Sequence, residues 1–248
     1  MWGHGMNYLK HDFASRRRIF ELGAWFAQLP ATIQEKLLSE GRERQLNAGQ
    51  KLFDQGDAPT GLHGIISGEI HIKGTASNGH DVLMAIHRPA DWTGFLTCID
   101  HQPHPMSAVA ATDILFLTVP PASVHAIFET DIAAFRHLLT PELRVGRANY
   151  RWLIEMVTRP SLQRIASRLL DLARWPYGSR AGPTSPIDNV SQEDLANACN
   201  LSRQTMNSAL RQLEKRGFIR IGYGRIEIVD SRGMQDFIAS NPEEIGKL

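Results

Sequence analysis

Short runs in which apolar and polar residues alternate fill the chain from about residue 42 to residue 118. In one run Ile70 and Ile72 face one way, whereas His71 and Lys73 face the other. Glycines separate the runs at short intervals, as tight turns between strands require. The pattern predicts a β-roll, barrel or sandwich, with histidines such as His71 on the outer surface of a strand.

A helical periodicity replaces the alternation after Pro120 and Pro121. It predicts a helix from roughly Pro141 to Val157 with one apolar stripe. The stripe either packs on the β-domain of its own chain or pairs with a second copy of the chain. Gly146 lowers helix stability but permits close approach of two backbones, which favours the second interpretation. The stripe contains Leu139, Leu143, Gly146, Tyr150, Leu153 and Val157.

Pro160 interrupts the helical pattern and marks an expected hinge between two domains. A proline has no backbone N–H to donate, and its ring clashes with the preceding helical turn. A second amphipathic helix follows from Leu162 to Ala173. The turn-rich residues 175–186 then predict a loop.

The segment 190–217 predicts two capped helices joined by a short turn. Ser191 and Asp194 have the spacing of a capping box, and Ser202 can cap the second helix. On a helical wheel Met206 groups with three other apolar residues, and the opposite face is polar and basic. Arginine on such a face can bind guanine in the DNA major groove, and asparagine or glutamine can bind adenine.

Alternation resumes after Gly217 around Gly222, Tyr223 and Gly224, which predicts a β-hairpin. Two helices joined by a short turn and followed by a hairpin form a winged helix. A polar helix face that is merely solvated is the alternative to DNA binding. We expect these side chains to bind DNA: Ser202, Arg203, Gln204, Asn207, Ser208, Arg211, Lys215, Arg220 and Arg225.

The formal net charge of +1 hides an uneven distribution of charge. Residues 1–158 carry 14 Lys and Arg against 16 Asp and Glu, a net of −2, and residues 159–248 carry 13 against 10, a net of +3. All ten histidines lie in the first part. The two parts therefore differ in chemistry, and the cationic part is the one with the predicted DNA-binding helix.

Only two cysteines occur, Cys98 and Cys199. They are too few for a disulfide framework or an iron–sulfur cluster within one chain. The start of the sequence has no apolar leader, and no apolar run reaches the roughly 18 residues of a membrane helix. We expect a cytoplasmic protein without a membrane partner.

Over about residues 25–230 the chain resembles the Crp/Fnr family of bacterial transcription regulators. Ser191–Ile228 matches the family's helix-turn-helix signature, and Gly56-Asp57 and Gly68-Glu69-Ile70 resemble its β-roll turns. The resemblance implies an α+β fold in four parts. These are an extension (1–24), a cyclic-nucleotide-type β-roll sensor (25–135), a dimerisation helix with hinge (136–159) and a winged helix (160–248).

The resemblance also implies a function and partners. It predicts a homodimeric regulator, not an enzyme, that binds double-stranded DNA at a near-palindromic operator and acts with RNA polymerase. An enzyme built on Cys98, Asp100 and His101 is the rival interpretation. It is disfavoured because catalytic partners usually converge from separate elements, whereas these three lie on one short segment.

The effector site departs from the family pattern. Members that bind cyclic AMP have a Gly-Glu step and an Arg-Ser pair, where this chain has Gly94-Phe95 and Met106-Ser107. Loss of both charge-assisted contacts costs several kcal/mol of affinity, so we expect no standard cyclic AMP site. The pocket either takes a more apolar, small-molecule effector or is vestigial. Its expected residues are Gly94, Phe95, Met106, Ser107, Asn149 and Tyr150.

The cofactor is left open by the sequence. Cys98, His101 and His104 lie on one short loop, which a haem- or metal-sensing member of the family would use. A polar, solvated loop is the commoner occurrence, and the spacing matches no specific metal site. We therefore assign no metal ligand from the sequence.

Overall fold

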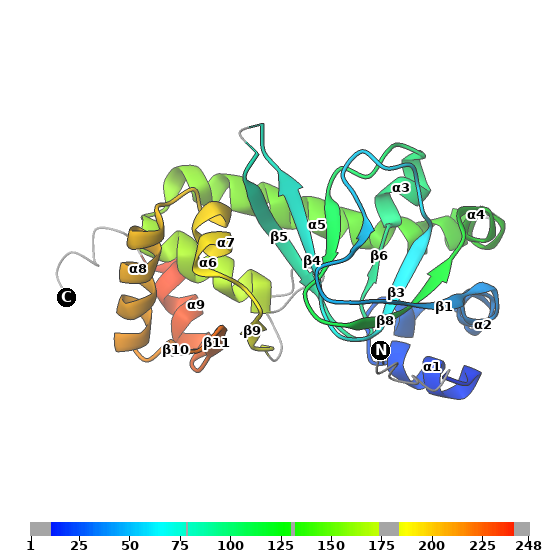
Figure 1. Cartoon of the computed structure of the whole chain (residues 1–248), viewed down its shortest axis with the longest axis horizontal. Coiled ribbons are helices and arrows are strands. Elements are labelled where there is room, and N and C mark those ends of the chain that lie inside the picture. The colour runs from blue at the N-terminus through cyan, green and yellow to red at the C-terminus, as the bar shows by residue number, and fades with distance from the viewer. Residues whose placement is uncertain (1–10, 78, 130–131, 174–183, 241–248) are drawn as a thin grey trace, which may run out of the picture.

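Antiparallel strands fill the region in which the sequence alternates, and they form the larger lobe in Figure 1. The computed structural model describes residues 11–77, 79–129, 132–173 and 184–240. Two four-stranded sheets, β1-β8-β3-β6 and β2-β7-β4-β5, make the β-roll that the sequence predicts. Their strands are β1 (Arg42–Leu46), β2 (Lys51–Phe53), β3 (Leu62–Ser67), β4 (Ile70–Thr75), β5 (Asp81–His87), β6 (Trp92–Thr93), β7 (Ser107–Ala110) and β8 (Ile114–Val119).

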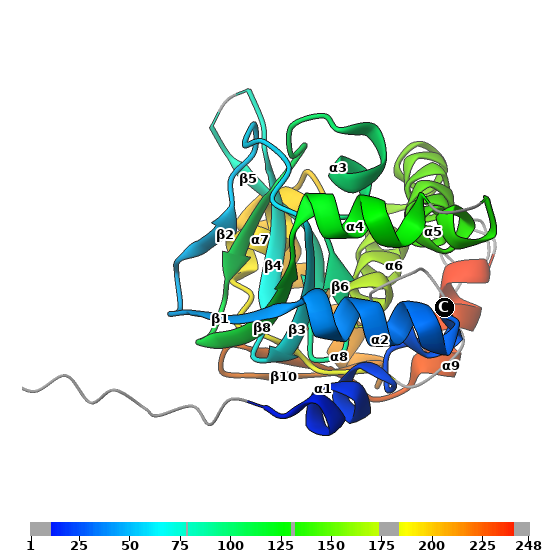
Figure 2. The same cartoon turned by 90° about the vertical axis from the view of Figure 1, so that its right-hand side faces the viewer.

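Helices cover the outside of the β-roll, and the longest of them, α5, also runs along the second lobe (Figure 1). Figure 2 shows α1 and α2 beside the sheet that contains β3, with α4 and α5 next to them. Phe20 at the end of α1 is fully buried, and its ring centroid lies 4.7 Å from that of Trp92. The helices are α1 (Phe13–Phe20), the 3-10 turn η1 (Phe26–Gln28), α2 (Ala31–Glu40), α3 (Phe95–Asp100), α4 (Pro121–Phe128) and α5 (Ile132–Thr158).

The long helix α5 begins at Ile132, so the expected start at Pro141 is wrong. Pro141 lies inside the helix and cannot donate a hydrogen bond to the carbonyl of His137, four residues earlier. The indole N–H of Trp25 donates to that carbonyl instead, at 2.8 Å. A side chain more than a hundred residues away along the chain thus satisfies the acceptor that the proline leaves open.

The smaller lobe is the winged helix that the sequence predicts, and a break between α5 and α6 at Pro160 is confirmed. The predicted loop 175–186 lies mostly outside the described residues, and its last part leads into a short strand, β9, that the sequence did not indicate. The elements are α6 (Ser161–Ala173), β9 (Ile187–Asp188), α7 (Gln192–Ala198), α8 (Arg203–Lys215), β10 (Ile219–Gly222), β11 (Arg225–Ile228) and α9 (Ser231–Ala239).

The two lobes pack against each other along β5, which lies between them in Figure 1. Leu83 and Ile86 of β5 belong to the same apolar cluster as the buried residues of α6, α7 and α8. Arg88, just after β5, donates to the carbonyls of Leu172 and Pro186 at 3.3 and 2.8 Å. The winged helix therefore shares part of its core with the β-roll.

This packing makes the expectation for His71 wrong. Its ring lies on the strand face opposite Ile70 and Ile72, but only 4% of the residue is exposed. Burial, aided by the positive charge of Lys73, lowers the pKa of His71 to about 4.

Within the described residues, no helix has both the length and the apolar composition needed to cross a membrane.

The bond from Trp25 to helix α5 yields a stability prediction. Trp25→Phe removes the only polar group of the side chain and leaves the carbonyl of His137 without its donor, so we expect the free energy of unfolding to fall by roughly 1–3 kcal/mol. In a Pro141→Ala background, the new amide of residue 141 can donate to the same carbonyl, and the loss should shrink by about 1 kcal/mol.

Urea denaturation of the four proteins in this cycle measures the coupling. The lost ring volume of Trp25 is the same in both backgrounds and cancels. Equal losses with and without Pro141 would show that the indole N–H does not compensate for the proline.

Candidate DNA-binding surface and effector cavity

Helices α7 and α8 each begin at a cap that the sequence predicts. Ser191 caps α7 in a full capping box with Asp194, whose amide donates to the Ser191 hydroxyl at 3.0 Å. Ser202 caps α8 by accepting from the amide of Thr205 at 3.1 Å. In the turn between them Asn200 has a φ of +51°, a left-handed conformation that asparagine tolerates well. These local bonds set where α8 begins.

One face of α8 is buried and the other carries polar and basic side chains. Met206, Leu210 and Leu213 are buried in the core of the winged helix. The outer face is an open, shallow surface that contains six of the nine residues expected to bind DNA. It is lined by Arg203, Gln204, Asn207, Ser208, Arg211, Gln212 and Lys215.

Gln212 belongs to this surface but was not among the expected residues. It follows Gln204 and Ser208 at steps of four along the helix, a spacing that indicates the same face. That spacing was the signal that could have identified it.

The three other expected DNA-binding residues lie elsewhere. The hydroxyl of Ser202 is engaged in the cap of α8. In the hairpin of β10 and β11, Arg220 pairs with Glu227 at 3.1 Å and Arg225 pairs with Asp188 at 3.3 Å. Both pairs are solvent-exposed and therefore weak enough to be exchanged for a phosphate.

A cavity of about 100 Å³ lies between the β-roll, α3 and α5. Four of the six expected pocket residues line it, namely Gly94, Phe95, Met106 and Asn149. Ser107 does not, because its hydroxyl donates to Asp54. Tyr150 does not either, since it is 70% exposed on another face of α5. The structure adds His87, Trp92, His104 and Glu142 to the lining.

The cavity is apolar and has no cationic side chain that stays charged at neutral pH. Neither lysine nor arginine is among the described residues that line it. Glu142 of α5 is half-buried there, and burial together with the charge of Asp100 raises its pKa to about 7. Burial lowers the pKa of His87 to about 3, so its imidazole is neutral. Such a cavity disfavours an anionic ligand.

The structure separates Cys98, His101 and His104, so the loop that they share in sequence forms no metal or haem site of its own. Cys98, on α3, is buried in the core of the β-roll, and burial raises the pKa of its thiol to about 12. The thiol form therefore predominates at neutral pH, whereas the thiolate is the nucleophilic form. His104 stacks on Phe53 at 3.7 Å and lies 3.0 Å from the Thr60 hydroxyl. His101 lies on another side, beside His125.

The apolar stripe of α5 faces solvent over most of its length. Leu143, Tyr150, Leu153 and Val157 are 62, 70, 54 and 87% exposed. Ile154, at 63%, extends the stripe beyond the expected residues. Leu139 is half-buried, and a Cβ added at Gly146 would meet no atom within 4 Å. The predicted stripe is thus an exposed apolar surface in the single chain.

Two family models match the chain. Residues 43–131 match the cyclic nucleotide-binding domain, and residues 163–237 match the Crp-like helix-turn-helix domain. These ranges cover the β-roll and the winged helix. The cyclic nucleotide-binding model ends just before α5, and the helix-turn-helix model begins near the start of α6.

Known transcription regulators are similar to this chain in sequence and in fold. The chain is 27% identical to the CRP-like cAMP-activated global transcriptional regulator of Mycobacterium tuberculosis, over 74% of this chain and 82% of that one. It is 26% identical to the cyclic AMP receptor protein of Thermus thermophilus, over 80% and 89%. The solved structure of FixK2 from Bradyrhizobium japonicum matches the fold with a TM-score of 0.68 at 18% identity, covering 81% of this chain and 98% of FixK2. With its β-roll, its winged helix and these relatives, the chain belongs to the Crp/Fnr family and is a DNA-binding transcription regulator.

Proposed function

We propose that the protein is a homodimer that reads a near-palindromic operator with the exposed face of α8. The observation that carries this proposal is the surface on which Arg203, Gln204, Ser208 and Arg211 lie together. Arginine and glutamine suit the edges of guanine and adenine, and the cations at the ends of the surface suit phosphates. As a regulator of transcription, the dimer has RNA polymerase as its expected partner.

The exposed stripe of α5 supports the dimer. Five large apolar side chains, Leu143, Tyr150, Leu153, Ile154 and Val157, lie along one helix and are more than half exposed. Such a stripe pairs well with an identical one across a two-fold axis, because each side chain then packs between those of the partner helix. A two-fold dimer presents two α8 helices and thus favours a two-fold operator.

The cavity supports an effector other than a cyclic nucleotide. A cyclic nucleotide carries a phosphate, and the described lining offers no lysine or arginine to neutralise it. Phe95, Met106 and Trp92 line the cavity instead, which suits a compact, largely apolar molecule. A vestigial cavity without ligand is the alternative. A thermal unfolding midpoint that rises on addition of cyclic AMP would contradict this part of the proposal.

The proposed base contact predicts the effect of Arg203→Ala. A duplex selected from a random pool by the wild-type protein serves as the operator. Loss of an arginine that contacts a base should weaken binding by about 1–3 kcal/mol, roughly 5- to 150-fold, as measured by fluorescence anisotropy.

Arg232→Ala is the matched control for this prediction. It removes the same charge from an exposed position on α9, away from the surface on α8. The affinity of Arg232→Ala for the selected duplex should stay close to that of the wild type. Equal affinities of both variants and the wild type for the selected duplex would exclude α8 as the reading helix.

If the apolar stripe of α5 is the dimer interface, Leu153→Glu should convert the dimer to a monomer. Leu153 is 54% exposed in the single chain, so the change costs little folding stability, but it places two carboxylates in an apolar interface. Sedimentation velocity should show one species of half the wild-type mass. Leu22→Glu, at an 84% exposed leucine outside α5, should remain dimeric. A dimeric Leu153→Glu variant would place the interface elsewhere.

The half-buried Glu142 predicts a pH-dependent stability. Its folded-state pKa of about 7 lies above the value of 4.5 for the free group, so folding favours the neutral acid. Its contribution to stability is full below pH 4.5 and is lost as pH rises towards 7. Glu142→Gln avoids this loss and keeps an acceptor for the Leu96 amide.

Urea denaturation at pH 4.5 and pH 8 measures the effect. The difference in the free energy of unfolding between Glu142→Gln and the wild type should shift in favour of Glu142→Gln by roughly 1–3 kcal/mol from pH 4.5 to pH 8. Glu35→Gln, at an exposed position on α2, should show no such growth. An advantage of Glu142→Gln that does not depend on pH would mean that this carboxyl titrates as in water.

A further inference from the structure

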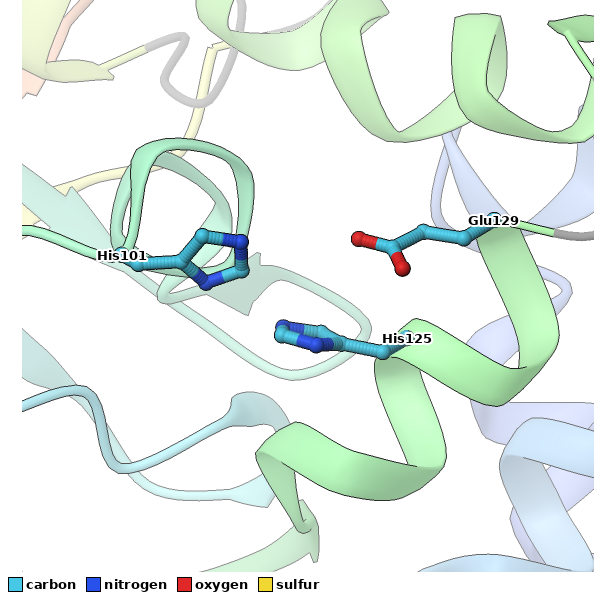
Figure 3. A group of neighbouring side chains, drawn as sticks. All are labelled: His101, His125 and Glu129. Atoms are coloured by element: carbon cyan, nitrogen blue, oxygen red, sulfur yellow. The ribbon is translucent and has the colours of Figure 1, made fainter.

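Two histidines and a glutamate meet on the surface of the β-roll, outside both the cavity and the DNA-binding surface. They are His101, at the C-terminal end of α3, His125 of α4, and Glu129, which caps the C-terminal end of α4. One ligand atom from each lies within 4.8 Å of the other two. Figure 3 shows the three side chains pointing towards one another across the gap between α3 and α4.

The backbone sets this arrangement. His101 ends α3 in the left-handed conformation, with a φ of +57°, and its amide donates to the carbonyl of Thr97 at 3.1 Å. His125 and Glu129 are four residues apart, and the amide of Glu129 donates to the carbonyl of His125 at 2.9 Å. Residues four apart on a helix share one face, so both side chains project towards His101.

One atom of this group lacks a partner. The Nε2 atom of His125 is buried and has no hydrogen-bond partner among the described residues. An unsatisfied buried polar atom costs about 1–3 kcal/mol, and most such atoms in folded proteins have a partner. The rings of His101 and His125 meet edge to face with their centroids 4.5 Å apart, a favourable ring contact that still leaves the Nε2 atom of His125 without a hydrogen-bond partner among the described residues. An imidazole nitrogen with an open lone pair is a metal ligand.

We propose that His101, His125 and Glu129 bind one divalent transition-metal ion of the zinc class. Two imidazoles and one carboxylate are a donor set for Zn²⁺, Co²⁺ or Ni²⁺, with water in the remaining positions. Ligands 2.0–2.1 Å from a tetrahedral ion lie about 3.4 Å apart, so the three atoms, which lie within 4.8 Å of one another, must approach by at most about 1.4 Å. His101 and Glu129 are exposed and can close this distance by side-chain rotation.

The ion would join two elements next to the cavity. Phe95, Leu96 and Thr97 of α3 line the cavity, whereas α4 leads towards α5. A metal ion held by both therefore fixes the end of α3 against α4. This site is independent of the proposed operator contacts, since none of its residues lies on the winged helix.

Zinc titration of the full-length, untagged chain after removal of bound metal tests the proposal. A chromophoric chelator competes for Zn²⁺ and reports affinity and stoichiometry. We expect one ion per chain, and at least ten-fold weaker binding in each of His101→Ala, His125→Ala and Glu129→Gln. His80→Ala removes an exposed histidine in the turn between β4 and β5, and this variant should bind Zn²⁺ as tightly as the wild type.

A thermal unfolding series separates loss of ligands from loss of fold. Zn²⁺ should raise the midpoint of the wild type and of His80→Ala, but not that of the three site variants, whose metal-free midpoints show whether they fold. Co²⁺ in the wild type should give visible d–d absorption that the double variant His101→Ala/His125→Ala lacks. A wild type that binds no zinc, or site variants that bind it as tightly, would overturn the proposal.

Discussion

A buried guanidinium joins the two lobes, and the rest of the architecture depends on it. Arg168 of α6 is almost fully buried and donates to the carbonyls of Leu83 and Met84 in β5, the latter at 2.9 Å. Burial lowers its pKa, although the charge of Asp171 opposes this effect. A cation removed from water is costly unless hydrogen bonds satisfy it, so the pair of strand carbonyls fixes where α6 lies.

Strand β5 thereby serves both lobes at once. Met84, Ala85 and His87 line the cavity, whereas Leu83 and Ile86 pack in the core of the winged helix. Lys73 of β4 adds an ion pair at 2.8 Å to Asp194, the residue that completes the cap of α7. A molecule in the cavity that moves β5 therefore acts on the packing of the helix-turn-helix without contacting it.

Elements whose causes are local were predictable from the sequence. The alternation of the strands, the caps at Ser191 and Ser202, and the apolar face around Met206 all depend on neighbours a few residues away. The start of α5 was not predictable, because Pro141 is tolerated through a bond from Trp25. The burial of His71 also involves a distant segment, since Asp194 of α7 pairs with Lys73 on the same strand and lies near the His71 ring.

The candidate sites also divide into one that depends on residues close in sequence and one that depends on residues far apart. The polar and basic face of α8 was largely predictable, because residues on one helix keep their spacing in the fold. The group around His101 was not predictable, since its partners come from α4 and not from the neighbouring Cys98 and His104. Cys98 is buried in the core, His104 stacks on Phe53, and His101 lies beside His125, so three residues that are close in sequence have separate surroundings in the fold.

Helix α5 packs on its own chain with one face and leaves its apolar stripe exposed on another. Ala134, Leu138 and Ala148 are buried, the first two in the core of the β-roll. Arg151 and Glu155 bond Asp171 and Ser167 of α6, next to Arg168. The remaining face is the exposed stripe. A partner helix seated on it, as in the proposed dimer, would be connected through α5 and α6 to the carbonyls of β5, which would make the proposed dimer interface, the cavity and the winged helix parts of one mechanical unit.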